Sequence, residues 1–96
     1  MLPKLDRGRI KVRVKKIERN DFGDHKELRN ADKVWELRFD FGPDYRVYYG
    51  EVEDEDLVII LTGGDKVTQT QDIETAKGLW KYWKENRDDQ TQQAIQ

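Results

Sequence analysis

The stretch that decides the fold is residues 34–41, which read VWELRFDF. From Trp35 onward apolar and polar side chains alternate, and a period of two is typical of a β-strand with one buried face. The apolar face holds Trp35, Leu37, Phe39 and Phe41, and the polar face holds Glu36, Arg38 and Asp40. Residues 42–44, Gly-Pro-Asp, are a turn signal, and residues 45–49, YRVYY, follow as a second strand. The two runs therefore predict a β-hairpin.

A third strand is predicted over residues 57–61, LVIIL, after an acidic turn at residues 51–56. Because this run is apolar at every position, we expect it to be buried on both faces or to lie centrally in the sheet. Residues 20–33 are mostly polar and are predicted to form a connection without regular structure.

Helices are predicted on either side of these strands. Residues 4–19 alternate like a strand at positions 10, 12 and 14, but their apolar residues also fall roughly on one helical stripe. The length of the segment and the stop signal at residues 20–24 favour a helix. A second helix is predicted over residues 68–86, and its apolar face consists of Ile73, Ala76, Trp80 and Trp83. Residues 87–96 have little to bury and are expected to be disordered.

Together these elements predict a single α+β domain over residues 1–86. Its order is a helix, a three-stranded antiparallel sheet and a C-terminal helix. Both helices are expected to pack on the Trp/Leu/Phe face, which leaves the polar face of the sheet open.

Composition excludes several classes of protein. The chain of 96 residues has no cysteine, which rules out disulfides, thiolate metal sites and thiol catalysis. No apolar run approaches the length of about 18 residues that a membrane helix needs, and no secretory signal follows the basic N-terminus. We therefore expect a soluble, cytoplasmic protein.

The net charge is −2, but residues 1–50 hold 13 Lys or Arg against 9 Asp or Glu, so this half could bind phosphate. The alternative is an ordinary solvated surface.

The predicted hairpin places several charged side chains together. A three-residue turn makes Asp40 face Arg46 and Arg38 face Tyr48, and opposed residues share one side of a sheet. Two guanidiniums and a phenol on an open face could grip a phosphodiester and stack on a base. The alternative is that Asp40 and Arg46 form a cross-strand ion pair and that Tyr48 is an ordinary surface residue.

Two other features of the sequence are weaker indications of a functional site. Gly63-Gly64-Asp65-Lys66 precedes a helix, where glycines favour anion binding, and Lys66 could reach a phosphate held by the arginines. The alternative is a tight turn with a solvated lysine. His25 is the only histidine, and a single histidine in a loop is more often a surface residue than a base. Metal ligands would have to be carboxylates alone, and we predict neither a metal nor another cofactor.

Four segments in this order and spacing resemble a known family. They are NDFGDHK at 20–26, VWELR at 34–38, FGPDYRVYY at 41–49 and GGDK at 63–66. Over about residues 4–84 the chain resembles the phage-derived, HigB-like addiction module killer proteins of the RelE/ParE toxin superfamily.

The resemblance implies the toxin of a toxin–antitoxin module, and many such toxins are ribosome-dependent endoribonucleases that cut mRNA without a metal. It implies that Arg46 holds the scissile phosphate and that Lys66 stabilises the phosphate or the leaving group. Arg38 matches a basic strand residue of the family, and Lys26 matches a recurrent RNA-binding lysine. A small helix-turn-helix antitoxin is the expected partner.

The family pattern differs from this chain in ways that leave alternatives open. Family members begin with an additional strand, and its absence here predicts an exposed sheet edge that pairs with a partner or a second copy. Val34 and Glu36 stand where RelE has lysines, and the chain is acidic overall. The alternatives are a ParE-like inhibitor of DNA gyrase and an inactive relative that survives as an antitoxin-binding module.

Overall fold

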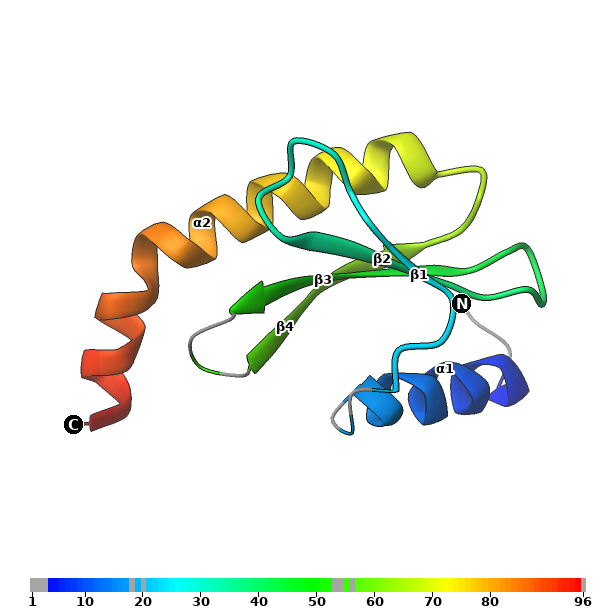
Figure 1. The fold of residues 1–96 in the computed structure, drawn as a ribbon, viewed down its shortest axis with the longest axis horizontal. Helices are drawn as coiled ribbons and strands as arrows, with labels where there is room; N and C mark the ends of the chain where they lie inside the picture. Colours follow the sequence, from blue (N-terminus) through cyan, green and yellow to red (C-terminus); the bar gives the residue numbers. More distant parts are fainter. Residues whose placement is uncertain (1–3, 18, 20, 53–54, 56, 96) are drawn as a thin grey trace.

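The computed structural model describes residues 4–17, 19, 21–52, 55 and 57–95, and it describes side chains as far as residue 87. The elements follow the chain as α1 (Lys4–Ile17), β1 (His25–Glu27), β2 (Val34–Arg38), β3 (Arg46–Val52), β4 (Leu57–Gly64) and α2 (Gln69–Ile95). The predicted α+β class is confirmed, with a helix, an antiparallel sheet and a C-terminal helix (Figure 1).

The sheet has the strand order β1-β2-β3-β4, and each neighbouring pair is antiparallel. Three of these strands match the predicted ones, and β1 adds a fourth inside the polar connection predicted at residues 20–33. β1 has only three residues, His-Lys-Glu, and carries no apolar alternation that would have identified it. It is recognisable only through its pairing, since His25, Lys26 and Glu27 lie opposite Leu37, Glu36 and Trp35.

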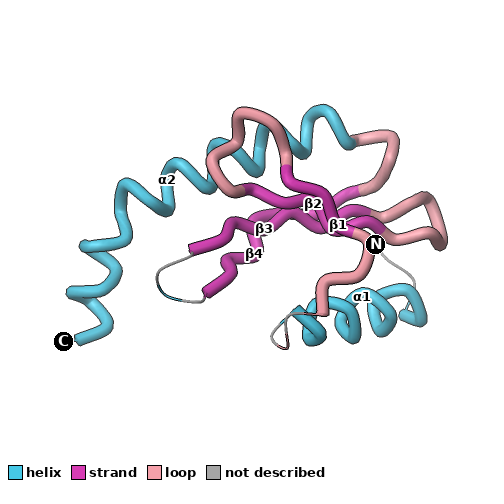
Figure 2. Tube along the Cα trace, viewed as in Figure 1, coloured by secondary structure: helices cyan, strands magenta, loops and turns pink. Residues whose placement is uncertain are grey.

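The two helices cover opposite faces of the sheet (Figure 2). On the α1 face, Ile17 packs with Leu37, Phe39 and Tyr49. On the other face, Ala76 and Trp80 of α2 form a second core with a set of strand residues and one loop residue, namely Ala31, Val34, Tyr48 and Val52. The expectation that both helices share the Trp/Leu/Phe face is therefore wrong. The apolar stripe of α2 needs an apolar surface, and Tyr48 and Val52 supply one on the face that was expected to be open.

The hairpin of β2 and β3 has a longer loop than predicted. Arg38 lies opposite Arg46, and the Phe39 amide donates to the Tyr45 carbonyl at 3.0 Å, so residues 40–44 form the loop. Gly42 and Asp44 both have positive φ, at 59° and 61°. The pairing is thus shifted by two residues from the predicted register. Because side chains alternate with a period of two, this shift changes the partners but keeps every residue on its predicted side.

β4 lies at the edge of the sheet, not in its centre. It pairs with β3 from Arg46↔Gly64 to Val52↔Leu57. Leu57 and Ile60 are 40% and 47% exposed, so the expectation of a strand buried on both faces is wrong.

α2 continues beyond the predicted end at residue 86. Its backbone is helical to Ile95, through the residues that the sequence indicates as a disordered tail. The sequence RDDQTQQAI contains neither glycine nor proline, so nothing in it breaks a helix that has already begun.

Candidate functional site

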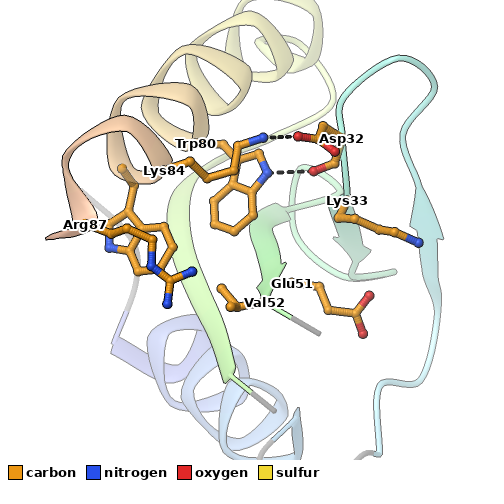
Figure 3. A pocket seen from close by; sticks show the side chains of 8 residues that line it. Asp32, Lys33, Glu51, Val52, Trp80, Lys84 and Arg87 are labelled. Carbon is orange, nitrogen blue, oxygen red and sulfur yellow. Dashed lines mark hydrogen bonds and ion pairs between the residues drawn. The ribbon is translucent and has the colours of Figure 1, made fainter. Parts of the chain in front are cut away.

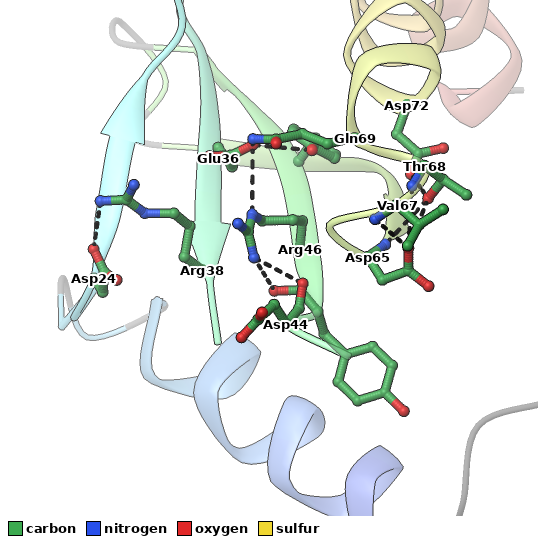
Figure 4. Close-up of polar contacts among 12 residues, drawn as sticks. Asp24, Glu36, Arg38, Asp44, Arg46, Asp65, Val67, Thr68, Gln69 and Asp72 are labelled. Carbon is green, nitrogen blue, oxygen red and sulfur yellow. Dashed lines mark hydrogen bonds and ion pairs between the residues drawn. The ribbon is translucent and has the colours of Figure 1, made fainter. Parts of the chain in front are cut away.

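Arg38 and Arg46 are cross-strand partners at one end of the sheet, on the α2 face (Figure 4). α2 packs chiefly on β4 and β3, so the β1 side of this face is not covered by the helix. Arg38 is 39% exposed, and its Nη2 donates to Asp24 Oδ1 at 2.9 Å. Its Nε is buried and makes no hydrogen bond.

Arg46 is more enclosed than Arg38, with a side chain that is 12% exposed. Its Nη1 donates to the Asp44 carbonyl at 2.7 Å, which ties the guanidinium to the hairpin loop. Its Nε lies 3.8 Å from Glu36 Oε2, which is an ion pair but too long for a hydrogen bond. The counter-ion of Arg46 is therefore Glu36 and not Asp40, which lies in the loop and is exposed.

Glu36 is the acidic centre of the site. It is 2% exposed, and its Oε2 accepts hydrogen bonds from the Tyr48 hydroxyl at 3.0 Å and from Gln69 Nε2 at 2.8 Å. Burial and the bond to Glu36 raise the pKa of the Tyr48 phenol. The sequence indicates Glu36 only as a surface charge, because it stands at a polar position of an alternating strand. Its partner Gln69 is 33 residues away, and no local signal reveals that contact.

Tyr48 is fully buried in the core beneath α2. The expectation that its ring lies on an open face, where it could stack on a base, is therefore wrong. Its hydroxyl instead orients the carboxylate of Glu36.

The two candidate lysines, Lys26 and Lys66, lie on either side of Arg38 and Arg46. Lys26 of β1 is exposed and is the cross-strand partner of Glu36, so it shares the α2 face with Arg38. Lys66 is also exposed, and its backbone amide donates to the Pro43 carbonyl at 3.4 Å. The segment that follows β4 thus meets the hairpin loop next to Arg46, whose cross-strand partner in β4 is Gly64.

Of the Gly63-Gly64-Asp65-Lys66 segment, the two glycines end β4, and Asp65 and Lys66 lead through a turn into α2. Asp65 Oδ1 accepts hydrogen bonds from the amides of Val67 and Thr68 at 2.9 and 3.1 Å, and the Thr68 hydroxyl donates to Asp72. A Cβ on Gly64 would lie 1.8 Å from Asp72 Oδ2, so only glycine fits there. The carboxylates of the chain itself occupy the start of α2, and the reading of this segment as an anion site is not supported.

His25 belongs to an aromatic stack on the α1 face. Its ring lies 4.9 Å from that of Phe22 and 4.8 Å from that of Trp35, and its Nδ1 is 3.0 Å from the Tyr49 hydroxyl. The half-buried imidazole therefore packs against the core and is not the exposed loop residue that the sequence predicts.

A small cavity of 290 Å³ lies at the other end of the sheet, where α2 meets the loop before β2 (Figure 3). Trp80 Nε1 donates to the Asp32 carbonyl at 2.6 Å, and Lys84 pairs with the Asp32 carboxylate. The rings of Trp80 and Trp83 stack 5.4 Å apart. These contacts fix the middle of α2 to the loop before β2, in which Asp32 and Lys33 have φ values of 55° and 74°.

Among the side chains that the structure places, no group of three or more His, Cys, Asp or Glu could hold a metal ion. Within the same part of the chain, no helix is long and apolar enough to cross a membrane.

Comparison with known proteins identifies a relative of this chain. The chain is 44% identical over 73 residues to an uncharacterized protein of Haemophilus influenzae, and the match covers 76% of this chain and 71% of that protein. No family model matches the chain, and no solved structure matches it.

Proposed function

The chain belongs to the same family as the uncharacterized Haemophilus influenzae protein, and we propose that it is the toxin of a toxin–antitoxin module that cleaves mRNA. In this proposal it acts in the cytoplasm on mRNA bound to the ribosome, and a small helix-turn-helix antitoxin neutralises it. The resemblance of four sequence segments to HigB-like toxins supports the proposal, and so does the arginine pair.

The observation that carries the proposal is the pair of guanidiniums that Arg38 and Arg46 bring together on one face of the sheet. Each guanidinium has a buried Nε–H that makes no hydrogen bond, and the two residues lie opposite each other on neighbouring strands. Buried donors without acceptors are rare in folded proteins and are costly where they occur. A phosphodiester does not reach the buried Nε atoms directly, but the exposed part of the Arg38 guanidinium offers forked donors that match phosphate geometry.

The exposed lysines extend this positive surface beyond the arginines. Lys26 lies toward the open β1 side and is suited to contact the RNA backbone. Lys66 lies on the other side, where the loop after β4 meets the hairpin. Phosphate contacts of this kind are strong at low salt and carry no sequence preference of their own.

The proposed reaction is internal transesterification of RNA. The ribose 2′-hydroxyl gives its proton to water as its oxygen attacks the adjacent phosphorus, the bond to the 5′-oxygen of the next nucleotide breaks, and that oxygen takes up a proton from water. The products are a 2′,3′-cyclic phosphate and a 5′-hydroxyl, so atoms balance without a metal or a redox cofactor. Arg46 would stabilise charge on the phosphate in the transition state, and Lys66 would stabilise the leaving oxygen. Arg38 would hold the same phosphate.

A second candidate function is an antitoxin-binding module without nuclease activity. The enclosure of Arg46 favours it, because this side chain is 12% exposed and is bound to Glu36 and to the Asp44 carbonyl. A phosphate can reach Arg46 only if these internal contacts give way or if it approaches the exposed remainder of the guanidinium.

Induced expression in bacteria tests both candidates. If the proposal is right, wild-type chain arrests growth and shortens cellular mRNA, whereas Arg46→Ala does neither at equal protein level. Arg29→Ala is the matched control, because Arg29 is exposed in the loop before β2 and is not part of the site. Normal growth and intact mRNA with the wild-type chain would contradict the nuclease and favour the binding module.

A further inference from the structure

The free edge of β4 carries the sequence of a central strand. Its first five residues, LVIIL, are apolar at every position, which is typical of strands that have neighbours on both sides and cover on both faces. In the part of the chain that the structure describes, β4 pairs only with β3. The sequence of β4 therefore predicts a neighbouring strand on its free side, and the described residues do not provide one.

Exposed apolar side chains flank this edge on both faces of the sheet. Ile60, 47% exposed, is the partner of Tyr49 and lies on the α1 face. Leu57, 40% exposed, is the partner of Val52 and lies on the α2 face. An added strand would cover both residues, which neither helix does. Scattered exposed apolar residues are common, but here they coincide with unpaired backbone.

α2 adds a third apolar side chain beside the same edge. Leu79 is 43% exposed and lies seven residues after Asp72, which puts the two on the same side of the helix. Asp72 contacts β4, since its carboxylate fills the space where Gly64 lacks a Cβ. Leu79 therefore lies on the β4 side of α2.

A β-bulge limits the regular part of the edge. Tyr48 pairs with Thr62 and Tyr49 with Ile60, so Leu61 is an extra residue in β4. Bulges disturb pairing and increase the local twist. The segment Leu57–Ile60, which we call the β4 edge, is thus the part best suited to accept a strand, and it contains both exposed apolar side chains of β4, Leu57 and Ile60.

We infer that the β4 edge joins two copies of this chain, whose edges pair as antiparallel strands about a two-fold axis. An antiparallel edge is complementary to itself, because a two-fold axis places the same surface on both sides of the interface. Residues 57–64, LVIILTGG, contain no charge, so no like charges meet near the axis.

The charges that flank β4 favour the antiparallel arrangement. Five of the six residues at 51–56 are acidic, and Lys66 follows the other end of the strand. In an antiparallel pair the acidic runs of the two copies lie at opposite ends of the interface. Each run then lies near the end of the partner's β4 that Lys66 follows. Parallel pairing would bring the acidic runs together.

Sedimentation equilibrium of the whole chain over a wide concentration range tests the inference. We expect wild type to approach twice the monomer mass and Ile60→Lys to remain a monomer, because two lysines would meet near the axis. Val12→Lys is the matched control, since Val12 is a 56% exposed apolar residue of α1, and it should associate like wild type. Circular dichroism checks that each variant folds, and Ile60→Thr replaces Ile60→Lys if the latter does not.

Cysteine cross-linking locates the interface independently, because the natural chain has no cysteine. Under mild oxidation Ile60→Cys should form a covalent dimer rapidly, and Val12→Cys should not. A wild-type chain that stays monomeric at every concentration would overturn the inference. So would a dimer that is unaffected by Ile60→Lys, or cross-linking at position 12 in preference to position 60.

Discussion

Glu36 connects the core beneath α2 with the arginine pair. Of the described residues it is the one charged side chain that is buried, and a single oxygen of its carboxylate contacts Tyr48, Gln69 and Arg46. A buried carboxylate is tolerated only where hydrogen bonds and a counter-ion replace water. Glu36 therefore stabilises the fold and also determines where the guanidinium of Arg46 lies.

Replacement of Glu36 tests the first of these roles. Glu36→Ala leaves Arg46 without its counter-ion and Tyr48 without its acceptor, and breaking a buried pair in this way costs about 3–5 kcal/mol of unfolding free energy. Glu36→Gln keeps an acceptor for Tyr48 and should cost less. Urea denaturation measures both. Glu27→Ala, at an exposed position of β1, is the control and should change stability by less than about 0.5 kcal/mol. Equal effects of Glu36→Ala and Glu27→Ala would contradict this role.

Arg46→Lys tests the role of the guanidinium in the proposed cleavage of mRNA. Lysine keeps the positive charge beside Glu36 but lacks the forked donors, so we expect the fold to survive and the cleavage rate to fall by about 10²–10³-fold. Single-turnover cleavage of ribosome-bound mRNA measures the rate, and thermal melting checks the fold. Arg29→Lys should behave as wild type. An unchanged rate in Arg46→Lys would remove Arg46 from the proposed site.

At the scale of elements, the packing of α2 on β3 depends on one missing side chain. Gly50 lies directly beneath Trp80, and a Cβ there would come within 2.3 Å of Trp80 Cε3. This close approach lets Trp80 enter the second core and reach the Asp32 carbonyl. The helix is thereby fixed to the sheet on one side and to the loop before β2 on the other.

A pair of glycine substitutions tests this contact. Gly50→Ala should destabilise the chain by about 1–3 kcal/mol or more, because the rigid indole and the strand must move apart. Gly78→Ala, in the interior of α2 with nothing within 4 Å of the added methyl, should stabilise it by about 0.5–1 kcal/mol. Thermal melting of both variants gives the two signs. A neutral Gly50→Ala would show that α2 is not held closely against β3.

The elements that the sequence predicts well are those with strong local signals. Alternation identifies β2 and the apolar stripe identifies α2, because each is a repeat of apolar residues that can be recognised within one segment of the sequence. β1 could not be predicted, since its three polar residues become a strand only by pairing with β2. The sequence does not reveal which face α2 covers, because β3 is apolar on both sides, with Val47 and Tyr49 on one and Tyr48 on the other.

The candidate site was predicted in part. Alternation correctly places Arg38 and Arg46 on one face. The observed pairing is shifted by two residues from the predicted register, and a shift by an even number leaves both side chains on the same face. The burial of Tyr48 and Glu36 could not be predicted, because it depends on Gln69 and Trp80 of a helix far along the chain. The sequence shows which side of a strand a residue occupies, but not which element covers that side.

At the scale of the whole molecule, two cores lie on either side of one sheet and each contains a buried tyrosine. Tyr49 lies in the α1-side core and Tyr48 in the α2-side core, and each is at most 1% exposed. Burial raises the pKa of both phenols, and for Tyr48 the bond to Glu36 raises it further. Ionisation of these two phenols therefore reports on the packing of both cores.

The raised pKa values predict loss of stability in alkali. Below pH 10 tyrosines are protonated in both states and contribute no pH dependence. Above the unfolded-state pKa of about 10, the unfolded chain loses these protons while the folded chain keeps them, so stability falls by about 1.4 kcal/mol per pH unit for each tyrosine. Urea denaturation between pH 9 and pH 11 measures the slope. Tyr48→Phe should have a shallower slope than wild type, and equal slopes would show that Tyr48 ionises alike in both states.

We propose as the central claim that this chain cleaves mRNA through its arginine pair, and mapping of RNA ends in a translating extract tests it most directly. Purified chain is added to the extract with a defined mRNA, and new 5′ ends are located and their chemistry determined. We predict discrete cuts within the translated region that carry 5′-hydroxyl ends, appear with wild type and Arg29→Ala, and disappear with Arg46→Ala. Intact mRNA with folded wild-type chain, or identical cuts with Arg46→Ala, would contradict the claim.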